Sequence, residues 1–312
     1  MVNQIISAAR YNVLQSRINN ILGIGSGNSG YNQDLDSATV PVGKTVTATD
    51  LNNLYNDFLN ARVHQTGAVP GTISTVANED EITEALHAAY ESLIADIETD
   101  KFLVGAGQAL PQSAGIDSTR TALWGGDGTP AFVQHEFTLT WGNANQRRGF
   151  FNAGGEIRFT ASLTNIPIAG ANAAKSQNWS DMLGNAQNVG MGTISFKHDQ
   201  TTSTGSGTGE TVGNFNLTNS YRQIFTKSGG VGSVYEENDY TIYAKNLNDN
   251  GIAFKVVFTD DNEAGREGAT PGTDPADERV EGTLTSQIVL FRATGIYVAA
   301  TDPAANTLVE LE

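Results

Sequence analysis

The sequence predicts an α+β protein in which an N-terminal helical region is followed by an antiparallel β-sandwich or jelly-roll-like domain. This prediction rests on how the spacing of apolar residues changes along the 312 residues. Over the first third they recur every three or four positions, as on one face of an α-helix, and later they alternate with polar residues, as in a half-buried strand. A stretch rich in Gly, Pro, Ser and Asp separates the two patterns. We therefore expect a helical anchoring or oligomerisation region over 1–110, a linker over 111–130 and a β-sandwich-like domain over 131–312.

Three helices are expected in the first region. The first ends at the glycine run 23–30, and the second is capped by Thr49 or Asp50. The third runs from about 78 to 102 and begins with three acidic residues, which the helix dipole favours there. We expect these helices to pack on one another or on a neighbouring subunit. Their apolar stripes are made by Val2, Ile5, Ile6, Ala9, Val13, Leu14, Ile18 and Ile21; by Leu51, Leu54, Tyr55, Phe58 and Leu59; and by Ile82, Leu86, Ala89, Leu93 and Ile97.

In the rest of the chain the apolar period is two. Three segments alternate clearly and four more are candidates, so seven or more short strands would follow one another without intervening helices. This pattern favours an antiparallel sandwich or a jelly-roll-like fold. The clear segments are 133–141, 157–163 and 252–258, the last preceded by a turn at 248–251, and the candidates are 194–198, 215–217, 240–243 and 284–292.

Charge and composition exclude several classes of function. The chain carries 18 Lys and Arg against 34 Asp and Glu, a net charge of −16, and it has no cationic stretch, so we expect no direct contact with nucleic acid. Its lack of cysteine excludes disulfides, thiolate zinc sites and a cysteine nucleophile. Because there is no apolar signal segment and no run of about 18 apolar residues, we expect a soluble chain made in a cytoplasm, without membrane insertion.

The motifs that could carry chemistry fail on their context. The spacing Gly25-x-Gly27-x-x-Gly30 matches a dinucleotide fingerprint, but a helix precedes it where a strand is required. No two histidines lie within a helical turn of each other, so none suggests a metal site. His87 and His135 neighbour apolar positions, and we interpret them as hydrogen-bonded structural residues. We expect no catalytic residue, no cofactor and no metal ligand.

Two polar loops, at 201–211 and 260–281, interrupt the expected strands. Both are too polar for burial, and we expect them to be exposed and mobile. In the second, Asp260, Asp261 and Glu263 could supply oxygen ligands to Ca²⁺, but they lack the spacing and the central glycine of an EF-hand loop. A charged turn is the favoured interpretation, and calcium binding at 260–281 is left open.

The most unusual segment is Trp141–Phe159, which joins two clear strands. It concentrates Arg147 and Arg148 with Phe150 and Phe151 in an otherwise acidic chain. In one interpretation it is a β-hairpin or a longer connection whose phenylalanines pack in the core. In the other the arginines meet acidic surface on a neighbouring subunit, which makes these four residues a candidate interface. In both cases at least one guanidinium should reach a carboxylate or backbone carbonyls, because an unpaired buried charge is costly.

Within this segment the run QRRGFFNAGGEIRF resembles virion structural proteins of large contractile-tailed phages, especially cyanophages, which are placed in tail, neck or fibre. Similar stretches occur in the helical region (YNVLQSRINNILGIGSGNSGYNQDL and LNNLYNDFLNARVHQTG) and in the β region (NSYRQIFTKSGG and NDYTIYAKN). The resemblance implies a non-enzymatic structural component of a tailed bacteriophage virion, assembled as symmetric copies. Its implied partners are identical subunits and other phage structural proteins, and its implied location is the virion.

Two other functions are weighed against this one. A host-receptor-binding adhesin of the phage tail would recognise surface glycan through exposed aromatics, and Trp124 and Trp179 beside polar loops are the candidates. An enzyme such as a glycan depolymerase would need a carboxylate pair in a groove, to which the sequence gives no pointer. For the structural role we expect a trimer, as for a projecting appendage.

Overall fold

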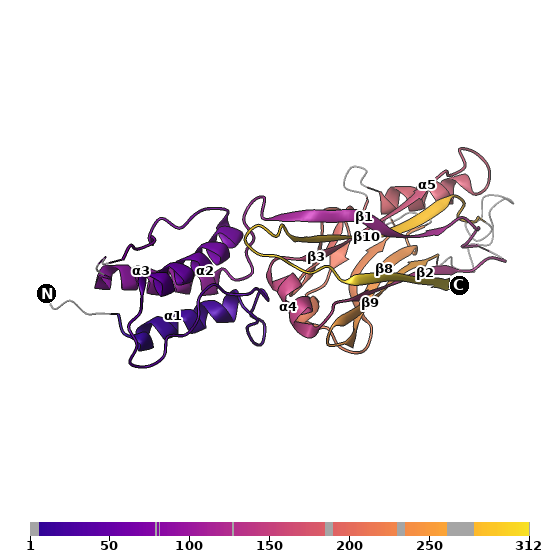
Figure 1. Ribbon diagram of the computed structural model, residues 1–312. Helices are drawn as coiled ribbons and strands as arrows, with labels where there is room; N and C mark the ends of the chain where they lie inside the picture. Colours follow the sequence, from indigo (N-terminus) through magenta and orange to yellow (C-terminus); the bar gives the residue numbers. More distant parts are fainter. Residues whose placement is uncertain are drawn as a thin grey trace. The chain divides into compact units, whose positions relative to one another are not determined.

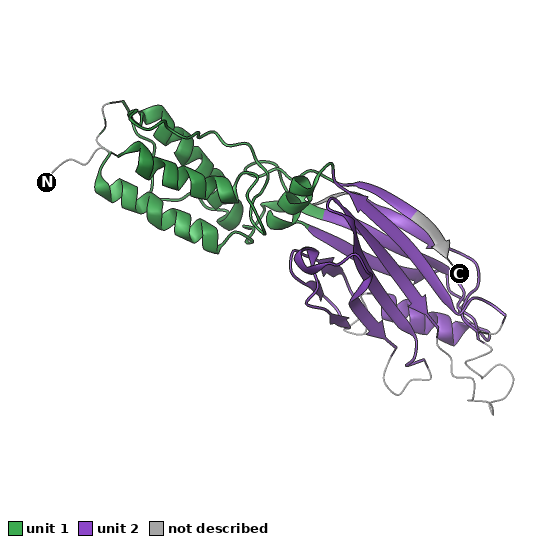
Figure 2. Cartoon of the chain, turned by 90° about the horizontal axis from the view of Figure 1, so that it is seen from below, with its two compact units in different colours: residues 1–111, 142–155, 291–302 green, residues 112–141, 156–290, 303–312 purple. Residues whose placement is uncertain are grey.

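The computed structural model describes residues 6–311 except 79, 81, 127, 185–189, 230–234 and 261–277, and it does not describe the side chains of 110–114 and 308–311. The chain forms two compact units, each built from separate stretches of sequence (Figure 2). Two stretches of the expected β domain, 142–155 and 291–302, belong to the unit that contains the N-terminal helices. Unit 1 consists of Met1–Pro111, Gly142–Gly155 and Phe291–Asp302, and unit 2 of Gln112–Trp141, Glu156–Leu290 and Pro303–Glu312.

Unit 1 contains the three expected helices, and a side chain caps the start of each. Ser7 accepts a hydrogen bond from the Arg10 amide, Thr47 and Asp50 form a reciprocal capping box, and Thr83 accepts from the amide at the third position of its helix. The helices are α1 (Ala8–Ile21), α2 (Ala48–Thr66) and α3 (Glu84–Thr99) (Figure 1). Capping thus sets where these helices begin.

Two expected helix starts are wrong. α2 is capped by Thr47 rather than by Thr49 or Asp50, because the Thr47 hydroxyl accepts from the Asp50 amide. α3 begins at Glu84 and not near residue 78, because Thr83 supplies its cap. Of the acidic residues expected in its first turn, 79 and 81 lie outside the described residues, and Asp80 precedes the helix.

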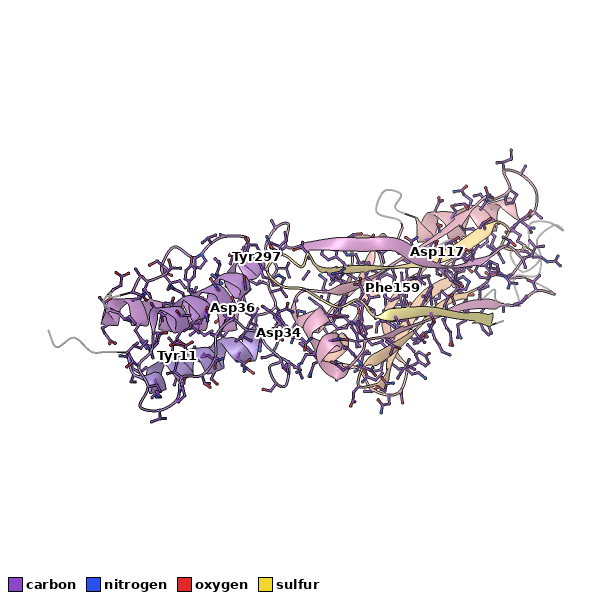
Figure 3. All side chains as sticks on the ribbon, viewed as in Figure 1. Tyr11, Asp34, Asp36, Asp117, Phe159 and Tyr297 are labelled. Atoms are coloured by element: carbon purple, nitrogen blue, oxygen red, sulfur yellow. The ribbon has the colours of Figure 1, made fainter. Side chains whose placement is uncertain are left out.

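The apolar stripes of the helices form the core of unit 1. The rings of Phe58 on α2 and Tyr90 on α3 meet edge to face, with centroids 5.2 Å apart. Ala9 and Val13 are exposed, contrary to expectation, because the buried face of α1 is turned away from them. Val2 and Ile5 lie outside the described residues. The buried face of α1 is made by Ala8, Tyr11, Leu14, Gln15, Ile18 and Ile21 (Tyr11 is labelled in Figure 3).

Unit 2 is built on two antiparallel sheets, as the alternating pattern predicts. Among the described residues one sheet has five strands in the order β1-β10-β3-β4-β5, and the other has six in the order β11-β2-β9-β8-β7-β6. The first comprises β1 (Ala109–Arg120), β10 (Thr283–Ala293), β3 (Glu156–Thr164), β4 (Ile194–Phe196) and β5 (Thr201–Ser203). The second comprises β11 (Ala304–Leu311), β2 (Phe132–Thr140), β9 (Gly251–Thr259), β8 (Asp239–Asn248), β7 (Arg222–Ser228) and β6 (Thr208–Gly209).

The two sheets pack face to face through aromatic side chains. Phe254 of β9 meets Phe159 of β3 and Phe196 of β4, with ring centroids 5.0 and 5.3 Å apart (Phe159 is labelled in Figure 3). His135 of β2 also reaches the opposite sheet, where its Nδ1 lies 2.8 Å from the Ser286 hydroxyl on β10. The expected α+β fold with sandwich-like packing is therefore confirmed.

Several local expectations for unit 2 are wrong. Most of the expected linker 111–130 is ordered structure, because β1 pairs with β10 and Trp124 forms a bridge with Val280. The candidate strand 215–217 is occupied by a short 3₁₀-helix, η1 (Asn214–Asn216), and the expected loop 201–211 contains β5 and β6. The strands are also interrupted by the helix α5 (Ala173–Leu183), which packs on β3. Backbone pairing with distant strands decides the structure of 109–124 and of 201–209, and local composition does not reveal it.

Candidate functional site

The arginine-rich segment is helical. Residues Ala144–Asn152 form the helix α4, where a β-hairpin or a longer connection was expected. Asn143 supplies its N-cap by accepting a hydrogen bond from the Gln146 amide at 2.9 Å, and the Gln146 side chain accepts from the Gly142 amide at 2.9 Å. These two local contacts begin a helix where the strand pattern ends.

Helix α4 lies against residues 23–33, which follow α1 and which we call the glycine-rich loop. Asn152 Nδ2 donates to the Gly30 carbonyl at 3.0 Å, and Arg148 Nη2 donates to the Ile24 carbonyl at 2.7 Å. The backbone approach is so close at Gly149 that a Cβ there would lie 2.7 Å from the Tyr31 carbonyl oxygen. The loop with the apparent dinucleotide spacing, Gly25-x-Gly27-x-x-Gly30, therefore belongs to the surface on which α4 packs.

The four candidate interface residues are placed unequally. Phe150 and Phe151 are fully buried, with their rings edge to face at 5.1 Å, as the core interpretation predicts. Arg147 is 6 % exposed, and Arg148 is half-buried. The bond from Arg148 to the Ile24 carbonyl confirms that one guanidinium reaches backbone carbonyls. Arg148 alone keeps an accessible surface that a neighbouring subunit could contact.

A second connection joins the loop to the 291–302 stretch of unit 1. The Gln33 side chain donates to the Ala299 carbonyl at 2.7 Å and accepts from the Ala299 amide at 2.8 Å. The Gln33 side-chain amide thus satisfies the hydrogen-bonding capacity of both the N–H and the C=O of Ala299. Unit 1 is thus held together by contacts between segments far apart in the sequence.

Two buried histidines serve as packing groups. His64 lies with its ring centroid 5.3 Å from that of Tyr31, and burial lowers its pKa to about 4. Burial likewise lowers the pKa of His135 to about 4, with a smaller contribution from the Arg120 charge. His135 bonds to Ser286, and His87 Nδ1 lies 2.8 Å from Arg10 Nη2, so both are hydrogen-bonded as predicted. Within the described residues no cluster of His, Asp and Glu has the arrangement of a metal site.

Unit 2 contains a buried ion pair formed by Lys175 on α5 and Asp260. Lys175 Nζ lies 2.9 Å from Asp260 Oδ2, and both side chains are fully inaccessible to water. Asn238 is also buried; with its amide nitrogen toward Asp260 it donates to Oδ1 at 2.5 Å, and its oxygen accepts from Trp179 Nε1 at 3.1 Å. In the opposite amide orientation the Asn238 side-chain oxygen would face Asp260 Oδ1, and two acceptors would meet. We call Lys175, Asp260, Asn238 and Trp179 the Lys175 cluster.

Aromatic side chains enclose this cluster. Trp179 meets Trp124 at 4.8 Å and Phe258 at 6.1 Å between ring centroids. All three tryptophans of the chain are buried, so Trp124 and Trp179 are not exposed as a sugar platform would require. Trp179 lies on α5, which packs on β3, and Trp124 contacts Trp179 and pairs with Val280. The polar loops around the two tryptophans did not indicate this arrangement.

The acidic loop is anchored at both described ends. Asp260 is occupied by Lys175 and Asn238, and Glu278 accepts a hydrogen bond from the Tyr235 hydroxyl. Both carboxylates are buried, contrary to the expected exposed turn. Asp261 and Glu263, the other candidate calcium ligands, lie outside the described residues, so calcium binding at 260–281 stays open. No sequence signal links Lys175 to Asp260, since nothing local pairs them.

Comparison with protein-family models, with curated proteins and with solved structures finds no match to this chain. In the described part of the chain no helix is long and apolar enough to cross a membrane.

Proposed function

We propose that the chain is a non-enzymatic structural component of a tailed bacteriophage virion, present as symmetric copies in a tail, neck or fibre. The observation that carries this proposal is that the segment whose sequence resembles phage virion proteins forms the helix α4 and packs within unit 1. Its Phe150 and Phe151 are buried, its Gly149 admits a close backbone contact, and its Asn152 and Arg148 bond to the glycine-rich loop. The distinctive residues of the resemblance thus build the architecture of unit 1.

The buried titratable groups support the same proposal. His64 and His135 are neutral near pH 7 because burial lowers their pKa to about 4, and each is enclosed by its own chain. A general base must reach a substrate proton, which these rings do not. The adhesin alternative gains no specific support, because its candidate tryptophans are buried.

An antibody raised against the recombinant chain tests the proposal on tailed phage particles purified from the source of this sequence. Gold-labelled antibody should bind intact particles at one recurring position on the tail, neck or fibre, and digestion of the particles should release peptides of this chain. Particles of another phage type prepared in parallel serve as the control. Finding the chain only in the soluble fraction of the lysate, with none in purified particles, would contradict a virion role.

A further inference from the structure

The Lys175 cluster brings together an amine, a carboxylate and a carboxamide. The two oxygens of Asp260 contact the other two groups, Oδ2 meeting Lys175 Nζ at 2.9 Å and Oδ1 meeting the Asn238 amide nitrogen at 2.5 Å. The relative exposure of Asp260 is 4 %, that of Asn238 is 1 % and that of Lys175 is 0 %. One carboxylate therefore bridges a buried nucleophile and a buried acyl group.

A buried ion pair is an expensive way to fill a core. Removing both charges from water has a large free-energy cost, and hydrophobic residues of similar size often stabilise a fold as well or better. The bridging position of Asp260 and the aromatic surroundings of the cluster match what transfer of an acyl group to an amine needs. Such a reaction requires a proton carrier between the amine and the leaving group, a donor to the carbonyl oxygen, and exclusion of water.

We propose that the chain forms an internal isopeptide bond between Lys175 Nζ and Asn238 Cγ, with Asp260 as the proton carrier. Asp260 takes a proton from the Lys175 ammonium, and the freed lone pair of Nζ attacks Cγ. The Cγ–Nδ2 bond then breaks as Asp260 returns the proton to Nδ2, which leaves as ammonia. The second Nζ proton passes to the ammonia, so that an alkylammonium and a carboxamide become a substituted amide and an ammonium ion. The Asp260 carboxylate is regenerated, and no oxidant or metal takes part.

Trp179 has a defined place in this step. Its Nε1–H donates to the Asn238 carbonyl oxygen at 3.1 Å, which is where negative charge develops when Cγ becomes tetrahedral. The same contact turns the amide so that its nitrogen, the leaving group, faces Asp260. Trp124 and Phe258 pack around the Trp179 ring, which keeps water from competing with Lys175 for Cγ.

The surroundings favour Asn238 over Asp260 as the acyl group. Direct condensation of Lys175 with Asp260 would release water and would leave no carboxylate to carry the proton. The donor from Trp179 also points at Asn238 and not at Asp260. The bond would tie α5 to the residue before β8 and would stabilise unit 2 by constraining its unfolded chain. This inference rests on the geometry of the cluster and is independent of the virion proposal.

Intact-mass spectrometry of the denatured, purified full chain tests the bond. The expected mass is that of the sequence less one ammonia, and digestion should yield a branched peptide joining Lys175 to Asn238. A mass equal to that of the sequence would overturn the proposal. Loss of one water with a branch from Lys175 to Asp260 would overturn the assignment of Asn238. Ammonia loss without the branched peptide would come from another asparagine and would also count against it.

Variants test the roles of the amine and of the carboxylate separately. Lys175→Arg removes the nucleophile and keeps the charge, and Asp260→Asn removes the proton carrier and keeps the shape, so each should show the full sequence mass and no branched peptide. The matched control is Lys255→Arg, since Lys255 Nζ also pairs with a carboxylate, Glu136, at 3.1 Å, but at a partly exposed site. That variant should keep the crosslink. A branched peptide that persists in Asp260→Asn would contradict the role of Asp260, and the wild-type mass decides the proposal even if a variant fails to fold.

Discussion

Gly149 lies in the middle of α4 with the backbone of the glycine-rich loop against it. Replacing a helical glycine by alanine ordinarily stabilises a helix by about 1 kcal/mol. Here the added Cβ would lie 2.7 Å from the Tyr31 carbonyl oxygen and 2.8 Å from Asn32 Cβ. We therefore expect Gly149→Ala to lower the free energy of unfolding by roughly 1–3 kcal/mol, measured by urea denaturation.

Gly71 provides the matched control for this substitution. Nothing lies within 4 Å of a Cβ built there. Gly71→Ala should leave the free energy of unfolding within about 0.5 kcal/mol of the wild type. If Gly149→Ala were as stable as Gly71→Ala, the close contact between α4 and the loop would be wrong.

The buried histidines predict a pH dependence at the same scale. Burial lowers the pKa of His64 and of His135 from the ordinary 6.5 to about 4. The unfolded chain then binds more protons than the folded chain between these values, so stability is fully present above pH 6.5 and falls as pH drops toward 4. Each histidine contributes on the order of 3 kcal/mol to this fall. Urea unfolding between these pH limits should show a smaller loss in His135→Gln than in the wild type, and equal losses would remove His135 as a cause.

At the scale of the element, α4 carries two adjacent arginines that differ in burial. Arg147 is almost fully buried, so Arg147→Ala removes buried side-chain packing and should lower the melting temperature of the isolated chain. Arg148 is half-buried, and its Nη2 donates to the Ile24 carbonyl and to Asn145 Oδ1, so Arg148→Ala should lower the free energy of unfolding by about 1–2 kcal/mol. We expect Arg148→Ala to weaken incorporation into particles more than its small stability loss explains. Normal incorporation of Arg148→Ala would make the arginine an internal feature only.

The elements also differ in how far the sequence predicts them. The turn at 248–251 was recognisable because its asparagines and glycine lie between two alternating segments, and β8 and β9 do pair around it. Helix α4 was not recognisable, because Asn143 before it and its few apolar residues are also typical of a turn-rich connection. Burial of the two phenylalanines agrees with one of the two interpretations of this segment, whereas their helical setting depends on contacts with a loop more than a hundred residues earlier.

At the scale of the whole molecule, the prediction of an α+β chain follows from periodicity, while the division into units does not. Asn152 bonds to Gly30, and Gln33 bonds to Ala299, so unit 1 is assembled from three stretches of sequence. Lys175 and Asp260 are likewise far apart in the chain. Local patterns carry no information on such pairs, which is why the Lys175 cluster and the burial of the tryptophans were missed.

Calcium binding at 260–281 is tested by removing divalent cations from the intact protein. Asp260 is held by Lys175 and Asn238, and the described residues contain no metal-site cluster. We expect the melting temperature with a chelator to agree with the temperature measured in added Ca²⁺. A large drop on chelation would assign a calcium site to the 260–281 loop.

The central claim, a structural role in a tailed phage particle, is tested most directly by a cryo-electron microscopy map of the intact virion. The account predicts density for this chain in symmetric copies at the tail, neck or fibre, each touching an identical neighbour, with α4 folded onto the glycine-rich loop of its own chain. The number of copies around the axis also decides the expected trimer. A map that accounts for every protein of the particle without this chain would contradict the claim, as would a lone copy that contacts no identical neighbour.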